Sequence, residues 1–299
     1  MSTLAHVAGA ARPNFMVLTP LCVLLGVAVA VLDVGRIDPV DALVALLGAV
    51  LAHAAVNLLN EYDDFRSGLD AITVRTPFSG GSGTLPAHPD AASATLTAGV
   101  LCVAGTVLVG FYFAWVQGLA IVPLGLLGLV IVVAYTPWIT RHPLICLLAP
   151  GFGFGPLMVL GTAFALTGRF TPAAAWASLV PLLLVSELLL VNQFPDVEAD
   201  RKVGRHHLPI LAGRQVSARI YAVFLLGASV ATLGGVAAGL LPAWSLLALL
   251  PLPAALYLAR GVMQKANDLP GLIPLLGLNV AVILGTIALY AAGILIGAG

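Results

Sequence analysis

Charged side chains are scarce in this sequence. Only 9% of its 299 residues are Asp, Glu, Lys or Arg, and 60% are hydrophobic. Soluble domains carry about 25% charged residues. The formal net charge is zero, so there is no basic surplus of the kind that binds nucleic acid. These shortages exclude an ordinary soluble domain and a nucleic-acid-binding protein, and they indicate a protein embedded in a lipid bilayer.

Cysteine is also scarce. Cys22, Cys102 and Cys146 lie far apart inside apolar runs, and no two of them form a CxxC pair. We interpret them as small buried side chains and expect no disulfide. The apolar runs also lack the alternation of polar and apolar residues that a transmembrane β-barrel requires.

Continuous apolar runs of about 20 residues, the length that crosses a bilayer as a helix, recur along the chain. We predict an all-α integral membrane protein, a single domain over residues 1–299 with nine transmembrane helices. The predicted spans are 14–33, 40–60, 94–113, 118–136, 145–166, 173–193, 216–238, 242–260 and 272–296.

The basic residues favour one side of the membrane. Of the 13 Lys and Arg residues, all but Arg36 and Arg169 lie in the N-terminal segment or after the second, fourth, sixth and eighth predicted spans. The positive-inside rule then predicts a multi-pass protein of the cell (inner) membrane with a cytoplasmic N-terminus and an outside C-terminus. The longest hydrophilic connections, 61–93 and 194–215, follow the second and sixth spans. We therefore predict two four-helix repeats plus one helix, with a site at their interface.

Two acidic motifs follow the second and sixth predicted spans. The first, over residues 60–70, reads NEYDDFRSGLD, and the second, over residues 192–200, reads NQFPDVEAD; both contain Asn-x-x-x-Asp. Two acidic clusters at one membrane depth require a cation between them. The motifs hold seven of the 13 acidic residues: Glu61, Asp63, Asp64, Asp70, Asp196, Glu198 and Asp200.

The spacing predicts how the motifs are built. Residues four apart share a helix face, so Asn60 and Asp64 point the same way. We expect Gly68 to end the first helix and to fold Asp70 back. In the second motif we expect an unbroken helical row from Asn192 to Asp200, kinked at a proline.

Carboxylate and amide oxygens are the ligands of a hard cation. Mg²⁺ typically takes one or two carboxylates and completes its shell with substrate phosphates. Two solvated helix ends are the alternative, which the repeated spacing disfavours. The predicted ligands are Asn60, Asp63, Asp64, Asp70, Asn192, Asp196 and Asp200.

Basic and glycine-rich groups accompany the motifs. The run Arg75–Gly83 presents backbone amides to an anion or serves as a flexible linker. A bound diphosphate bridged by Mg²⁺ accounts for the cations near both motifs, although topology alone also places cations there. The predicted substrate-binding residues are Asn57, Asn60, Arg75, Tyr135, Arg141, Asn192, Lys202 and Arg205.

Two ionisable residues lie inside predicted spans. Glu187 has no charged neighbour in the sequence, and such a carboxylate is costly enough in a membrane to indicate function. It either takes a proton from an acceptor or hydrogen-bonds a neighbouring helix. His53 lies seven residues before Asn60, and we interpret it as a packed bundle histidine rather than a ligand.

The motifs resemble those of the UbiA superfamily of intramembrane prenyltransferases, whose aspartate-rich motifs follow the second and sixth of nine helices. NEYDDFRSGLD and NQFPDVEADRKVGRHHLPILAG are most similar to the 1,4-dihydroxy-2-naphthoate prenyltransferase branch. The segments 135–137 and 155–157 also match, and the resemblance covers nearly the whole chain. Glu61 stands where Asp is commoner, Arg205 stands for a Lys, and segment 150–153 lacks a Glu that many naphthoate enzymes carry.

The resemblance implies a Mg²⁺-dependent enzyme that transfers a prenyl group from an allylic polyprenyl diphosphate to an aromatic, quinone-precursor-like acceptor within the membrane. Asp64, Asp70, Asp196, Asp200 and Glu187 are its expected catalytic residues. A terpene cyclase on the same scaffold and an ion-coupled transporter are the rival interpretations. Transporters usually place their acidic residues nearer the membrane midplane, whereas these lie at helix ends.

Overall fold

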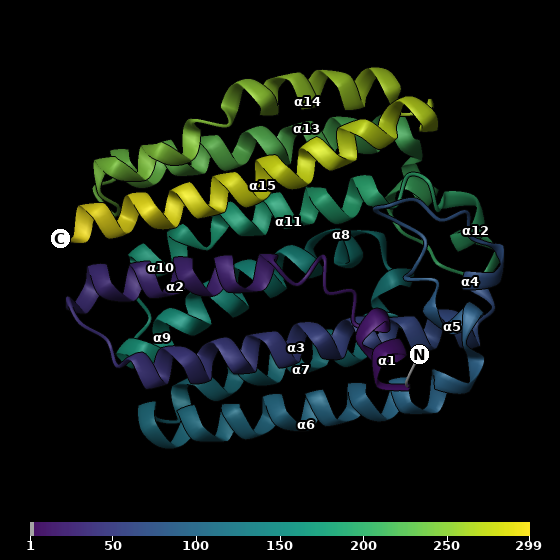
Figure 1. Cartoon of the computed structure of the whole chain (residues 1–299). Helices are drawn as coiled ribbons and strands as arrows, with labels where there is room; N and C mark the ends of the chain where they lie inside the picture. The colour runs from purple at the N-terminus through teal and green to yellow at the C-terminus, as the bar shows by residue number, and fades with distance from the viewer. Residues whose placement is uncertain (1–2) are drawn as a thin grey trace.

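The computed structural model describes residues 3–299, and this part of the chain holds helices and no β-strand. Most of the helices run along one direction and form an elongated bundle (Figure 1). The α-helices are α1 (Thr3–Ala10), α2 (Leu18–Val34), α3 (Pro39–Arg66), α4 (Leu69–Ile72), α5 (Thr84–Ala87), α6 (Ala92–Gln117), α7 (Val122–Ala134), α8 (Pro143–Phe152), α9 (Gly161–Thr167), α10 (Pro172–Ala177), α11 (Leu179–Asn192), α12 (Val197–Lys202), α13 (Leu208–Ala237), α14 (Leu252–Lys265) and α15 (Leu269–Ala298). A π-helix, η4 (Gly153–Leu160), joins α8 to α9, and the short 3-10 helices are η1 (Pro89–Ala91), η2 (Leu119–Ile121), η3 (Ile139–Arg141) and η5 (Ala243–Leu249).

Seven helical stretches of the described chain are long and apolar enough to cross a membrane. They fall on the second, third and fifth to ninth predicted spans. Two shorter apolar stretches, Leu18–Val34 and Leu119–Ala134, fall on the first and fourth. The all-helical architecture is confirmed, while the count of nine membrane crossings stays a prediction.

Helices α3 and α10 each begin at a capping side chain followed by proline. Asp38 accepts a hydrogen bond from the Val40 amide at 2.7 Å, and Pro39 is the first helical residue of α3. Thr171 caps the Ala174 amide at 3.2 Å, just before Pro172 of α10. Such caps satisfy amides that have no partner inside the helix, and proline fits the first turn because its missing N–H is not needed there.

Helix α11 is the centre of the packing. It contacts α8, α13 and α15, and its side chains join the large buried cluster of the bundle. The outer faces of α6 and α7 instead carry exposed apolar side chains, including Leu108, Phe111, Trp115 and Val130. An exposed apolar surface of this kind is unfavourable in water and matches lipid tails.

Both acidic motifs lie at one end of the bundle. Helices α4, α5 and α12 gather there beside α1, and the C-terminus lies at the opposite end (Figure 1). Helices α4 and α12 contact each other. The predicted convergence of the two motifs is therefore observed.

The first motif is built as the sequence predicts. Helix α3 ends at Arg66, and Gly68 adopts φ +76°, a left-handed conformation that other residues avoid. This turn starts α4 and brings Asp70 back toward Asp64.

The expected unbroken helix through the second motif is wrong. Helix α11 ends at Asn192, and α12 begins only at Val197. Pro195 has no N–H to donate, and the amides of Phe194 and Asp196 bond to carbonyls three residues back, at 3.1 and 3.2 Å. The segment therefore forms a tight turn rather than a kinked helix.

Candidate active site

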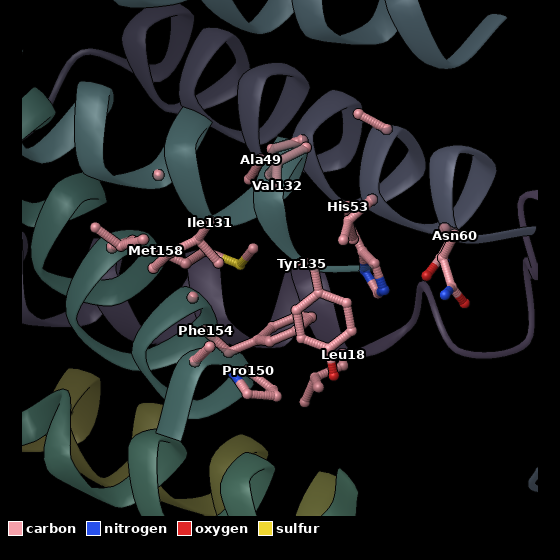
Figure 2. Close-up of a pocket in the computed structure, with 18 of the residues that line it drawn as sticks. Leu18, Ala49, His53, Asn60, Ile131, Val132, Tyr135, Pro150, Phe154 and Met158 are labelled. Carbon is pink, nitrogen blue, oxygen red and sulfur yellow. The ribbon is translucent and has the colours of Figure 1, made fainter. Parts of the chain in front are cut away.

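A cavity of about 560 Å³ opens between α3, α6, α7, the α8–η4 helix and α11. Most of its wall is aliphatic or aromatic. Figure 2 shows part of that wall, with Ile131, Val132, Phe154 and Met158 around one space. Its polar side chains gather toward the end of the bundle that carries the motifs.

Nine of the predicted site residues line this cavity. They come from α3, α4, the end of α7, the end of α11, and the segment that includes α12. The nine are Asn57, Asn60, Asp64, Asp70, Tyr135, Asn192, Asp196, Asp200 and Arg205.

Arg205 joins the two motifs. One of its guanidinium nitrogens donates to Asp64 of the first motif, and another donates to Asp200 of the second at 2.9 Å. Its side chain is only 16% exposed, so the contacts are stronger than those of a surface ion pair. His207 Nε2 meets the other Asp200 oxygen at 2.8 Å. The cation required between the acidic clusters is therefore supplied in part by the chain itself.

Two carboxyl groups at the mouth have unusual acidity. Burial, reinforced by the nearby charges of Glu61 and Asp64, raises the pKa of Asp70 to about 7. Burial and the neighbouring Asp200 carboxylate raise the pKa of Asp196 to about 7, although Ser79 and the Gly80 amide offset part of the shift. Both groups therefore exchange protons near neutral pH.

The glycine-rich segment packs against both motifs and is not a free linker. Ser79 and Gly80 lie against Asp196. A side chain at Gly81, where φ is +76°, would collide with the Asp70 carboxylate. The backbone can approach the acids this closely because the segment carries no bulk there.

Glu61 anchors this segment and the N-terminus. It is fully buried, accepts from Arg12 Nη2 at 2.8 Å and from the Ser82 amide at 3.1 Å, and also bonds the Ser82 hydroxyl. Asn57 Nδ2 donates to the Ala11 carbonyl at 2.9 Å. Helix α3 thus holds two distant segments at the cavity mouth. Arg12 lines the cavity, and no sequence motif indicated it.

Four of the predicted site residues outside the membrane interior do not line the cavity: Asp63, Arg75, Arg141 and Lys202. Asp63 is one residue from Asp64, which turns it about 100° away around the helix. The other three are exposed, and Arg75 packs over Gly83. The expected metal role of Asp63 and the expected substrate contacts of the three cations are not supported by their positions.

Glu187 also lies outside the cavity. It is fully buried and accepts a hydrogen bond from Asn279 Nδ2 at 2.9 Å, while Asn279 accepts one from the Tyr221 hydroxyl at 2.9 Å. This network joins α11, α13 and α15. Of the two roles that the sequence left open for Glu187, the position favours the helix-packing one over the catalytic one.

The mouth of the cavity fits a hard cation that a substrate helps to hold. Buried oxygens of Asp70, Asn192 and Asp196 have no hydrogen-bond partner. Asn60 donates its amide to Thr136 at 3.0 Å, which leaves its side-chain oxygen free to act as a ligand. Within residues 3–299, no three Asp, Glu, His or Cys side chains are grouped closely enough to bind a metal ion alone. Such a donor set suits Mg²⁺ with phosphate oxygens completing its shell.

Comparison with known proteins identifies the fold and the family. The model of the UbiA prenyltransferase family matches residues 18–273. The chain belongs to that family. It is therefore a membrane-embedded prenyltransferase, and its apolar helices and two-motif cavity agree with this assignment.

Two curated relatives of this UbiA-family prenyltransferase are 1,4-dihydroxy-2-naphthoate octaprenyltransferases. The protein from Bacillus subtilis is 27% identical over 268 residues, covering 87% of this chain and 82% of the relative. The protein from Escherichia coli is 27% identical over 287 residues, covering 95% and 92%.

Solved structures share the fold. A UbiA homologue from Aeropyrum pernix has a TM-score of 0.66 at 20% identity, covering 95% of this chain and 98% of the other. A UbiA homologue from Archaeoglobus fulgidus, solved with GPP and Mg²⁺, has a TM-score of 0.59 at 13% identity, covering 95% and 99%. At these identities the similarity establishes the architecture alone.

The position of Glu187 generates a first prediction for this prenyltransferase. Glu187→Gln retains an oxygen that accepts the Asn279 bond, so prenyl transfer is expected to proceed at the wild-type rate. Asn279→Leu leaves the buried carboxyl without a partner and is expected to lower stability by about 1–3 kcal/mol. Product formation and thermal unfolding in detergent measure the two effects. A Glu187→Gln enzyme that releases diphosphate but forms little coupled product would restore the catalytic role.

Proposed function

We propose that this chain transfers a prenyl group from an allylic polyprenyl diphosphate to an aromatic acceptor, inside the membrane and with Mg²⁺. The observation that carries the proposal is the convergence of two acidic motifs and Arg205 at one end of an otherwise apolar cavity. A diphosphate and a prenyl tail require these two environments side by side. The names of the curated relatives support a naphthoate-like acceptor, and the ligands of the Archaeoglobus structure support the other substrate.

Different residues at the cavity mouth are proposed to bind the metal ion and the diphosphate group of the prenyl substrate. Asn60, Asp64, Asp70, Asn192, Asp196 and Asp200 would hold Mg²⁺, which would supply positive charge to the departing diphosphate. Arg205 adds a fixed cation in a buried position, where electrostatic stabilisation is strong. Gly80 and Gly81 line the cavity beside these acids, so the backbone there would lie next to the diphosphate.

The apolar wall of the cavity is proposed to bind the prenyl tail. It surrounds the prenyl tail and keeps water from an allylic cation. An electron-rich ring then forms a bond to the prenyl carbon that loses the diphosphate. The bias of Lys and Arg supports a cytoplasmic mouth in the cell membrane, where a water-soluble acceptor enters directly.

Product analysis tests the proposal. Purified protein with Mg²⁺, a series of prenyl diphosphates and hydroxylated aromatic acceptors is expected to form C-prenylated aromatics detectable by mass spectrometry. Hydrocarbon or alcohol products from diphosphate alone, with none from the acceptor, would indicate a cyclase instead. Ion counterflow into proteoliposomes without product would indicate a transporter.

Metal removal gives a second prediction. Turnover is expected to stop in excess EDTA and to return with Mg²⁺ or Mn²⁺, because the donor set is oxygen only. Full turnover in EDTA would contradict the metal role of the motifs.

The motif aspartates give a third prediction. Asp64→Ala and Asp196→Ala are each expected to lower turnover at least about 100-fold. Asp196→Ala is expected to unfold cooperatively near the wild-type temperature, whereas Asp64→Ala also removes a partner of the buried Arg205 and is expected to be less stable. The matched control is Asp90→Ala, an exposed acid outside the cavity, which is expected to keep wild-type turnover. A wild-type rate of turnover in either variant would show that the mutated motif has no role in the active site.

The acidity of the mouth gives a fourth prediction. In the metal-free protein Asp70 and Asp196 have pKa values of about 7, so they hold protons at pH 6 and are mostly ionised at pH 8. Metal binding displaces these protons, and the affinity for Mn²⁺ is expected to rise by up to about tenfold per pH unit for each proton released. Mn²⁺ titrations followed by electron paramagnetic resonance at pH 6, 7 and 8 measure this. Equal affinities at pH 6 and pH 8 would contradict it, and Asp196→Asn is expected to reduce the slope.

A further inference from the structure

One imidazole faces the cavity and has no part in the metal site. His53 is the only histidine among the described residues that line the cavity. It lies on α3, seven residues or about 10.5 Å of helix rise from Asn60. Seven residues are nearly two full turns, so both side chains share the cavity face of α3, and Figure 2 shows them there with Tyr135 nearby.

The ring of His53 is held on two sides. Its Nδ1 lies 2.7 Å from the Thr19 hydroxyl of α2, and its ring lies nearly perpendicular to that of Phe154, with the ring centres 5.0 Å apart. Thr19 forms no other side-chain hydrogen bond within the described chain. When Nδ1 donates to this hydroxyl, Nε2 carries the free lone pair.

The second ring nitrogen is open to the cavity. Nε2 has no hydrogen-bond partner among the described residues, yet it is absent from the polar atoms that the protein seals off without a partner. It therefore has access to the cavity. A fixed imidazole with one nitrogen bonded and the other accessible is the arrangement of a general base.

We propose that His53 is the base that accepts the hydroxyl proton of the aromatic acceptor, a role that rests on the proposed prenyl transfer. The other acidic or basic groups of the cavity are committed elsewhere. The mouth carboxylates bind Arg205 and would hold the metal. The Tyr135 phenol is a poor base when neutral, and Glu187 lies outside the cavity. His53 lies on α3 about 10.5 Å of helix rise before Asn60, toward the apolar wall where the acceptor ring would meet the prenyl carbon.

The acceptor O–H proton moves to Nε2, and its electron pair stays on oxygen and enriches the ring. A ring carbon forms a bond to the prenyl carbon, whose bond to oxygen breaks with the electron pair leaving on diphosphate. The attacked carbon then loses its hydrogen as a proton to the diphosphate, and His53 returns its proton to the ring oxygen. The imidazole and the aromatic ring are both restored.

The test compares variants on acceptors of graded acidity. The probes are geranyl diphosphate with Mg²⁺, 1,4-dihydroxy-2-naphthoate, and fluorinated naphthols with progressively more acidic hydroxyls. His53→Gln keeps a hydrogen bond to Thr19 but accepts no proton, and it is expected to lower coupling about 100-fold or more with geranyl diphosphate binding unchanged. The deficit is expected to shrink as the acceptor hydroxyl becomes more acidic, because an ionised acceptor needs no base. Free imidazole is expected to restore coupling to His53→Ala.

Two controls keep the result specific. His142→Gln changes a histidine outside the cavity and is expected to couple normally. Thr19→Val removes the partner of Nδ1 and is expected to give an intermediate loss with the same dependence on acceptor acidity. If His53→Ala does not fold, His53→Gln and Thr19→Val carry the test.

The outcomes separate this proposal from the proposed function. Wild-type coupling in His53→Gln overturns the role of His53. An equal loss for every acceptor, accompanied by loss of geranyl diphosphate binding, shows that His53 only supports packing and overturns it too. A wild-type protein that binds geranyl diphosphate but couples it to no aromatic acceptor overturns the proposed function itself, and the role of His53 with it.

Discussion

The contact of Arg205 with one carboxylate from each motif is the interaction on which the site depends. Without Arg205, the carboxylates of Asp64 and Asp200 would be two negative charges facing each other in a largely buried position. Removing one partner of a buried ion pair costs about 3–5 kcal/mol of folding stability. The contact also fixes geometry. It ties the end of α3 to α12, and so it sets the width of the mouth through which a diphosphate head enters. The apolar wall is useful only because this polar end is held at a fixed place beside it.

Local physical rules predicted much of the fold and nine of the polar residues that line the cavity. The length of the apolar runs located the helices, since the backbone of a membrane-embedded segment must satisfy its own hydrogen bonds. Helical spacing placed Asn60 and Asp64 on one face, and the left-handed preference of glycine predicted the turn at Gly68 that returns Asp70. These features depend on neighbouring residues, so one sequence is enough to find them.

The predicted site residues that do not line the cavity share one cause. A sequence shows where a charged residue lies along the chain but not which way its side chain points. Arg141 and Lys202 turn outward, and Glu187 turns toward α15 rather than the cavity. Arg12 was missed because its partner Glu61 lies far along the chain, whereas His53 is the packed bundle histidine that the sequence suggested. The break after Asn192 was missed because a proline is compatible with both a kink and a turn, and the choice depends on contacts with α4 and segment 79–83.

The separation of Arg205 from Asp64, 141 positions along the chain, has a consequence for how the protein is made. Helix α3 leaves the ribosome and enters the membrane long before Arg205 is synthesised. Until then Asp64 must keep water or a proton, because no guanidinium is present to compensate it. The first half of the chain can therefore insert as helices, but its cavity mouth stays unfinished until the segment after α12 arrives. The ion pairs of Arg205 with Asp64 and Asp200 therefore form last during biosynthesis, and a nascent chain that stops before residue 205 cannot form them.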